Sequence, residues 1–528
     1  MKKSNLNLTY IMAIIAILIG GYLFIPGSTE VVETISLQSA ASTIIPKPLS
    51  YEAKEGGFQI GSNTVIYVKG NNSNETEELY KIAEFFKEKI KPATGLDIKI
   101  VRGEPTNKGA IYLTTIGGNK DLGNEGYDII STNESIEVKA YKPEGVSRAV
   151  QTLRQMLPAD IEKNTKVENI NWIIPAANIS DKPEYDYRGL MIDVARHFFT
   201  VDEIKRQIDL AAQYKINKVH LHLSDDQGWR LEIKKYPELT NIGGKTEVGG
   251  GKGGYYTQEE FKDLVNYAKD RYVEIIPEFD MPGHINAALA SYGFLNPDGK
   301  PKALYTGTKV GFSTLMTNDE KTYQFIDDLI KEVSTISPSK YIHIGGDEAD
   351  NTNKADYDYF VGRVSKIAQK YGKTPIGWDP IDTSSNIDSN TVLQNWKDSN
   401  EEARKKNMKM VISIAKKAYL DFQYDENTPY GLNWGGYNSI ENAYNWDPTD
   451  FAPKELVLGI EAPLWTEAIT DTKAMDYMIY PRLIGYSEIG WSPKASRSFR
   501  EFKERLKAQG TRLENQGVNY YKDKSIWQ

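Results

Sequence analysis

Residues 341–348 read YIHIGGDE, a short apolar run that leads through a Gly-Gly bend to two adjacent carboxylates. Chance alone gives roughly ten adjacent acidic pairs in a chain with 72 acidic residues among 528, and most such pairs are solvated. This pair stands out because it follows a predicted buried strand and two glycines, which let backbone or ligand approach closely. Carboxylates just past the carboxyl end of a strand are typical of α/β enzyme sites. We therefore expect Asp347 and Glu348 to perform acid/base chemistry.

Seven further apolar runs extend this pattern on both sides. Together with 340–346, the predicted strands are 187–194, 217–224, 272–278, 373–377, 391–395, 408–414 and 455–461. Amphipathic segments are predicted as helices at 201–215, 257–270, 319–336, 355–371, 470–483 and 499–513. Eight strand–helix units over about 340 residues predict an α/β fold of the (β/α)8 TIM-barrel type. A doubly wound open sheet is the alternative, although no Gly-rich phosphate fingerprint follows the first strand.

Two regions precede the predicted barrel. Residues 43–179 alternate strand-like pieces with helices near 75–90 and 144–156, which indicates a small α+β domain without a ligand signature. Residues 1–42 contain Lys2 and Lys3 ahead of an uncharged apolar run at 10–25, typical of a secretory signal; an uncleaved membrane anchor is the alternative. We therefore expect an exported protein, extracellular or at the cell surface, with its catalytic barrel at 180–528.

Composition excludes several classes of function. The net charge of −8 and the lack of a basic stripe argue against nucleic acid as a partner. The absence of cysteine removes disulfides, thiolate nucleophiles and zinc–thiolate sites. No motif predicts a cofactor.

The predicted strand ends provide a test of the barrel, because its active site must be assembled there. Strands two to eight all end in an acid or an aromatic residue. A ring of acids and indoles suits a sugar, whose C–H faces stack on aromatic rings while its hydroxyls bond to carboxylates. The residues at these ends include Asp225, His284, Asp347, Glu348, Trp378, Trp396, Tyr419, Asp421, Trp465 and Glu467.

An ordered set of motifs resembles the β-N-acetylhexosaminidases of glycoside hydrolase family 20. The motifs are GVSRAVQTLRQMLP, RGLMIDVARHFF, NKVHLHLSDDQGWR, PEFDMPGH, HIGGDE, GW, AYLD and APLWTE. The resemblance implies a catalytic barrel behind a small non-catalytic domain. It also implies exo-hydrolysis of terminal β-linked N-acetylglucosamine or N-acetylgalactosamine from an oligosaccharide or glycoconjugate, with retention.

The same resemblance implies roles for the residues. In this substrate-assisted family, an exception among glycosidases, the 2-acetamido oxygen attacks the anomeric carbon and gives an oxazolinium intermediate. Glu348 resembles the general acid/base and Asp347 the group that orients the acetamido N–H; a like-charged neighbour and a desolvated pocket are expected to favour protonated Glu348. Asp225 and His284 resemble the partners of Glu348, and the walls of the pocket are matched by Trp378, Trp396 and Trp465. Tyr419 resembles the donor to the acetamido oxygen. The sugar hydroxyls are matched by Asp421 and Glu467, with Arg188 on the 3- and 4-hydroxyls.

Arg188 fits the barrel poorly, since it lies near the start of strand 1, and a salt bridge at the surface or between the domains is its alternative role. Two other functions stay open. His220, His222, His284 and His343 fall on or after predicted strands, as in metal-dependent barrel hydrolases, although no H-E-x-x-H helix is present. The second is a glycan-binding protein that has lost catalysis, although both carboxylates of the Asp347–Glu348 pair are retained. We expect no metal.

Overall fold

A computed structural model describes residues 43–527, so the predicted signal or anchor at 10–25 lies outside the described residues. Within this described range, no helix is both long and apolar enough to cross a membrane.

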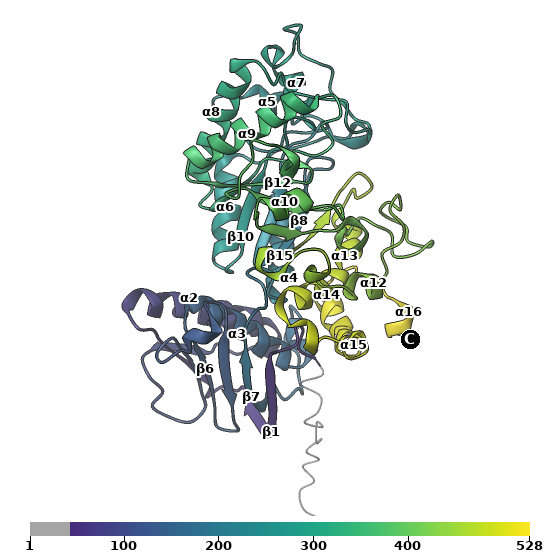
Figure 1. Ribbon diagram of the computed structural model, residues 1–528. Helices are drawn as coiled ribbons and strands as arrows, with labels where there is room; N and C mark the ends of the chain where they lie inside the picture. The colour runs from purple at the N-terminus through teal and green to yellow at the C-terminus, as the bar shows by residue number, and fades with distance from the viewer. Residues whose placement is uncertain (1–42, 528) are drawn as a thin grey trace, which may run out of the picture. The chain divides into compact units, whose positions relative to one another are not determined.

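The first domain is a seven-stranded mixed sheet packed on two helices (Figure 1). Its strand order is β1-β7-β5-β6-β4-β2-β3. Helices α2 (Ser73–Thr94) and α3 (Pro143–Met156) supply the buried apolar side chains that cover the sheet. The predicted domain end at 179 falls inside β7, which continues to Asp181. The strands are β1 (Ser50–Gln59), β2 (Val65–Lys69), β3 (Lys99–Arg102), β4 (Ala110–Thr114), β5 (Tyr127–Ser131), β6 (Ser135–Ala140) and β7 (Ile173–Asp181).

The second domain is a closed eight-stranded parallel barrel, which confirms the predicted fold. Around the barrel the strands follow chain order, with β15 pairing β8 to close it. All eight predicted strands are present. They are β8 (Tyr187–Asp193), β9 (Lys218–His222), β10 (Glu274–Glu278), β11 (Tyr341–His343), β12 (Thr374–Trp378), β13 (Val392–Asn395), β14 (Met410–Ile412) and β15 (Val457–Leu464).

The predicted helices surround this barrel, except that one of them is divided, and six short helices that were not predicted are also present. The single helix expected at 470–483 is two helices, because Pro481 has no N–H to continue the first. The long helices are α4 (Val201–Gln213), α6 (Gln258–Lys269), α8 (Glu320–Ile336), α9 (Lys354–Lys370), α13 (Thr472–Ile479), α14 (Arg482–Trp491) and α15 (Phe499–Asn515). The short ones are α5 (Glu238–Asn241), α7 (Asn286–Ser291), α10 (Glu401–Lys405), α11 (Ala415–Ala418), α12 (Ile440–Tyr444) and α16 (Lys524–Trp527).

The barrel interior changes from apolar to polar along the strands. One layer of side chains is formed by Tyr187, Ile276, Tyr341, Ile376, Val392 and Val411. Two residues further along each strand, side chains point to the same face again. After Tyr187 this position is Gly189, and on the other five strands it is polar or aromatic and fully buried or nearly so: Glu278, His343, Trp378, Gln394 and Ser413. The polar layer therefore lies directly under the carboxyl ends of the strands.

A buried charge cluster joins the two domains. Glu125, just before β5, forms ion pairs with Arg148 of α3 and Arg188 of β8, and Asn217 donates to its other oxygen at 3.1 Å. Arg188 is fully buried and also donates to the carbonyl of Lys215 at 2.8 Å. Burial raises the pKa of Glu125, but the two guanidiniums outweigh it and lower the pKa from 4.5 to about 2.

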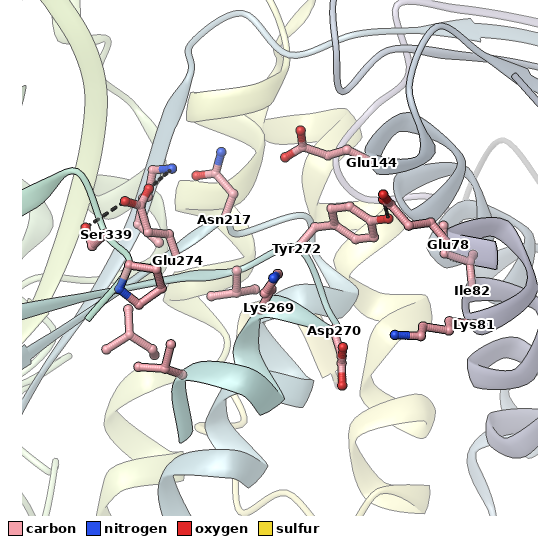
Figure 2. Close-up of a pocket in the computed structure, with 15 residues that line it drawn as sticks. Glu78, Lys81, Ile82, Glu144, Asn217, Lys269, Asp270, Tyr272, Glu274 and Ser339 are labelled. Atoms are coloured by element: carbon pink, nitrogen blue, oxygen red, sulfur yellow. Dashed lines mark hydrogen bonds and ion pairs between the residues drawn. The ribbon is translucent and has the colours of Figure 1, made fainter. Parts of the chain in front are cut away.

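A cavity of about 600 Å³ lies beside this cluster, lined by α2, α3 and the start of β10 (Figure 2). Its polar side chains bond to one another: Tyr272 donates to Glu78 at 3.0 Å, and Ser339 donates to Glu274 at 2.6 Å. Glu274 also pairs with Lys218 at 2.8 Å. The cavity is at the amino ends of the strands, whereas barrel enzymes carry their chemistry at the opposite rim. We assign it to a solvated domain interface.

We predict that Glu125→Gln lowers the free energy of unfolding at neutral pH by about 3 kcal/mol, because buried Arg188 loses its carboxylate partner and Arg148 keeps only the longer contact with Glu144 at 3.6 Å. Since the folded pKa lies below the unfolded one, this contribution is complete above pH 4.5 and disappears as the pH falls toward 2. Denaturant unfolding of both proteins across this range measures the difference, which should narrow in acid. Glu134→Gln, in the exposed pair with Lys108, is the control and should change little. A difference in the free energy of unfolding that does not depend on pH would contradict the proposed role of the Glu125 charge.

Candidate active site

A cavity of about 430 Å³ opens at the carboxyl ends of the barrel strands. It is large enough for a small ligand such as one sugar. Residues that follow seven of the eight strands line it, and the sequence-predicted site residues among them come together as expected. The lining residues are Arg196, Asp225, Asp280, His284, Thr308, Val310, Asp347, Glu348, Trp396, Tyr419, Asp421, Leu432, Trp434, Trp465, Glu467 and Ala468.

The Gly-Gly bend after β11 positions the two adjacent carboxylates. Gly345 and Gly346 have φ of 65° and 109°, in the region that glycine adopts most readily. The N–H of Gly346 donates to Oδ1 of Asp280 at 3.0 Å. A Cβ at Gly345 would lie 1.7 Å from the same oxygen. The bend therefore depends on glycine, and it turns the chain so that Asp347 and Glu348 face the cavity.

Glu348 ends a chain of alternating carboxylates and imidazoles. Its Oε2 is 3.3 Å from Nε2 of His284, whose Nδ1 is 3.1 Å from Asp225. Asp225 also pairs with Arg196 at 2.8 Å. The hydrogen bond from His284 holds the pKa of Glu348 below its usual range. The expectation that the pocket favours protonated Glu348 is therefore wrong for the protein without substrate, because the charged imidazole outweighs burial and the neighbouring carboxylate.

Asp347 has the opposite environment. It is almost fully buried, and burial raises its pKa, with the charge of Glu348 adding to the effect against the pull of His284. Asp280 lies close by, and its own pKa is raised well above its usual value by burial and by Asp347. The pKa of both carboxyls is thus raised, and that of Asp280 is raised more strongly. The two consecutive acids, Asp347 and Glu348, therefore have pKa values shifted in opposite directions.

Arg188 is not in this cavity, so its predicted contact with sugar hydroxyls is wrong. It is at the amino end of β8, fully buried in the Glu125 cluster. The arginine that does line the cavity is Arg196, which follows the carboxyl end of β8. Both arginines belong to the same motif, RGLMIDVARHFF, and the rule that barrel sites form at carboxyl ends favours Arg196. Arg196 contacts Asp193 at 3.1 Å, and its guanidinium lies 5.0 Å from the Trp465 ring centroid.

Aromatic rings form one wall of the cavity. Trp396 stacks on Tyr419 with ring centroids 6.4 Å apart, and Tyr419 is 6.2 Å from Trp465. Trp378 is fully buried behind this wall, 5.6 Å from Trp465, and it is not among the lining residues. Trp434 lines the mouth with 62% of its surface exposed. The sequence prediction missed Trp434, which lies in the loop after β14 rather than at a strand end.

Buried carboxylate oxygens face the cavity without side-chain donors within the described range. They are Oδ1 of Asp347, both carboxylate oxygens of Asp421 and Oε2 of Glu467. Burial raises the pKa of Asp421 well above its usual value, and Glu467 adds to this. Buried polar atoms normally have partners. These oxygens are therefore available to accept hydrogen bonds from ligand hydroxyl or amide groups.

Several histidine and carboxylate groups meet the spacing of a metal site, including His220, Glu278 and His343 below the cavity floor. These three are buried, and Glu278 lies 2.9 Å from Nε2 of His220 and 3.0 Å from Nδ1 of His343. The same Nδ1 of His343 accepts a hydrogen bond from the N–H of Gly345 at 3.1 Å. The groups nearer the cavity share the Asp225–His284 contact described above. Each of the four histidines in these groups thus contacts at least one carboxylate.

We predict that Gly345→Ala abolishes most activity and destabilises the fold, because the new methyl group must displace Asp280 and with it Asp347. Gly372→Ala is the matched control, since Gly372 has a similar φ of 72° and a methyl group added there would meet nothing within 4 Å. The control should lose about 1 kcal/mol from backbone strain alone and keep its activity. Thermal unfolding and hydrolysis assays compare the two. Equal effects would show that the Asp280 contact is unimportant.

Two family models match the chain in order. The model described as glycosyl hydrolase family 20, domain 2, covers residues 41–182, and the one described as its catalytic domain covers residues 185–494. A β-N-acetylhexosaminidase from Cellulomonas fimi is 34% identical over 475 residues, covering 88% of this chain and 92% of that protein.

Solved structures agree with these matches. The family 20 β-N-acetylhexosaminidase from Streptomyces coelicolor superposes with a TM-score of 0.87 at 41% identity, covering 92% of this chain and 99% of that one. A variant of the Streptomyces plicatus β-hexosaminidase, in complex with its product GlcNAc, gives a TM-score of 0.86 at 42% identity, covering 92% and 97%. With the closed barrel and the carboxylate pair in place, the chain belongs to glycoside hydrolase family 20.

Proposed function

We propose that Asp347 and Glu348 divide between them the chemistry of an exo-acting β-N-acetylhexosaminidase that works by substrate-assisted catalysis. The observation that carries this proposal is the opposite environment of two consecutive carboxyls. Glu348 faces His284 and has an exposed fraction of 34%, whereas Asp347 is buried against Asp280. One position is suited to exchange a proton with a leaving group and the other to hold a fixed hydrogen bond.

Glu348 and His284 hold one proton between them. Before substrate binds, the proton resides on the imidazole, because Asp225 raises the pKa of His284 well above its usual value. A bound sugar removes water from Glu348, and desolvation disfavours its charged form. The proton then moves from Nε2 of His284 to the carboxylate, which protonates the leaving oxygen. After departure of the leaving group, the Glu348 carboxylate takes a proton from water.

Asp347 acts on the nucleophile of the reaction, the acetamido group of the substrate itself. Its Oδ1 accepts a hydrogen bond from the acetamido N–H and so turns the acetamido oxygen toward the anomeric carbon. The same charge stabilises the oxazolinium that forms. In this proposal Tyr419 donates to the acetamido oxygen, and Trp396 and Trp465 enclose the methyl group; their presence in the cavity lining, with Trp378 packed against Trp465, supports it.

The remaining contacts hold the sugar ring. Arg196, Asp421 and Glu467 are proposed to bind its hydroxyls, and a cavity of about 430 Å³ accommodates a single terminal residue. This supports release of one N-acetylhexosamine, GlcNAc or GalNAc, at a time from the non-reducing end. Trp434 at the mouth offers a ring on which the next sugar stacks. Export directed by residues 10–25, with or without anchoring to the membrane, stays a prediction that cell fractionation tests.

We predict that Glu348→Gln lowers kcat at least about 100-fold on substrates with poor leaving groups, because the proton donor is lost. Product binding should hardly change, since the amide keeps the shape of the carboxyl. Steady-state kinetics with chitobiose and titration with GlcNAc measure the two effects. Asp350→Asn, exposed two residues further along, is the control and should behave like the unaltered protein. Full activity of Glu348→Gln would reject the assignment.

We also predict that an aryl β-glucoside, which has no 2-acetamido group, is not hydrolysed. The described acids provide a proton donor and a group for the acetamido N–H, while the nucleophile comes from the substrate. Release of the aryl group from matched glucoside and N-acetylglucosaminide substrates makes the comparison. Efficient cleavage of the glucoside would mean that a carboxylate of the protein attacks the sugar.

A further inference from the structure

Glu278 is a fully buried carboxylate at the end of β10, on which four side chains from three other strands converge. Its Oε1 accepts from the indole N–H of Trp378 at 2.7 Å and lies 3.0 Å from His343. Its Oε2 is 2.6 Å from His222 and 2.9 Å from His220. The proposed mechanism assigns no role to this group.

From Glu278 an unbroken series of contacts leads to the active site. Nδ1 of His222 faces Glu278, and its Nε2 is 2.9 Å from Oδ2 of Asp225. Asp225 in turn contacts His284, which contacts Glu348. Because carboxylates only accept, both ring nitrogens of His222 must carry hydrogen, and the imidazole is a cation. The charge facing it comes from Glu278, Asp225 and the nearby Asp193.

A second contact path leads from Glu278 to the aromatic wall. The Trp378 indole that donates to Glu278 also packs against Trp465, which lines the cavity. His222 touches the edge of the same Trp465 ring, with centroids 5.1 Å apart. One buried carboxylate thus contacts both the support of the wall and the imidazole beneath Asp225.

We propose that Glu278 is a positioning residue for catalysis, which keeps His222 a cation under Asp225 and so sets how readily His284 gives its proton to Glu348. Without the Glu278 charge, His222 becomes neutral and Asp225 loses a cationic neighbour. The Asp225 carboxylate, which faces Nδ1 of His284, then stabilises the charged imidazole more strongly, so the imidazole keeps its Nε2 proton more firmly. Glu348 receives that proton less readily, and reactions that depend on protonation of the leaving oxygen slow most. This inference rests on the proposed role of Glu348.

The matched control is Glu461, another fully buried carboxylate of the polar layer. It contacts Nδ1 of His220 at 2.9 Å, Gln394 at 2.6 Å and Tyr187 at 2.5 Å. Within residues 43–527 it makes no hydrogen bond or ion pair with Asp225 or Trp378. Glu461→Gln therefore disturbs the same layer to a similar extent without cutting the path to Glu348.

The test compares Glu278→Gln and Glu461→Gln on two substrates, 2,4-dinitrophenyl β-N-acetylglucosaminide and chitobiose. The dinitrophenolate leaves without a proton, whereas the sugar alcohol of chitobiose needs one. We expect Glu278→Gln to lose about tenfold more kcat on chitobiose than on the dinitrophenyl substrate. Glu461→Gln should lose equally on both. Equal losses on both substrates in both variants would reduce Glu278 to a structural role and overturn the proposal.

Two variants of His222 decide the matter if Glu278→Gln does not fold. In His222→Asn the side-chain amide nitrogen takes the place of Nδ1, so the hydrogen bond to Glu278 is kept and the contact with Asp225 is lost. In His222→Gln the side-chain amide nitrogen takes the place of Nε2, so the hydrogen bond to Asp225 is kept and the contact with Glu278 is lost. Both should show the larger loss on chitobiose, and a His222→Gln protein with unaltered rates on both substrates would contradict the proposal. If Glu348→Gln itself shows no leaving-group dependence, the proposed function fails rather than the role of Glu278.

Discussion

The hydrogen bond from the Gly346 N–H to Asp280 is the contact on which the rest of the site depends. It holds the backbone in a bend that only glycine adopts without strain, and it fixes the Asp280 carboxyl close to Asp347. Because the bend fixes the directions of two consecutive side chains, one carboxyl is buried and the other remains at the pocket mouth. Their different surroundings then shift their pKa values in opposite directions, which suits the two different roles that the proposed chemistry gives them.

This arrangement requires a polar barrel interior. Carboxylates and imidazoles alternate from Glu461 in the layer below to Glu348 in the cavity, so that each buried charge has a partner of opposite sign. Below them the apolar layer around Ile276 and Val411 provides ordinary packing. At the far end, the Glu125 cluster ties the first domain to β8. Stability and chemistry thus use separate layers of one barrel.

Much of this could be predicted from the sequence. The eight strands and the residues after them follow from periodicity, and the acid pair follows from its place behind YIHI. Two arginines in one motif, Arg188 and Arg196, could be separated only by their position along β8, and the resemblance pointed to the wrong one. The lowered pKa of Glu348 depends on a contact with His284, which lies after a different strand, and no local pattern reveals it. Convergence on Glu278 and exposure of Trp434 likewise arise from tertiary packing.

The central claim is that the substrate's own acetamido group is the nucleophile in a site whose histidines serve hydrogen bonds rather than a metal ion. The most direct measurement is hydrolysis of an aryl β-N-acetylglucosaminide with and without a chelator, and with a thiazoline that mimics the oxazolinium intermediate. The account predicts turnover that is unaffected by the chelator and blocked by the thiazoline. Turnover that the chelator abolishes and added metal restores, with no inhibition by the thiazoline, would contradict it.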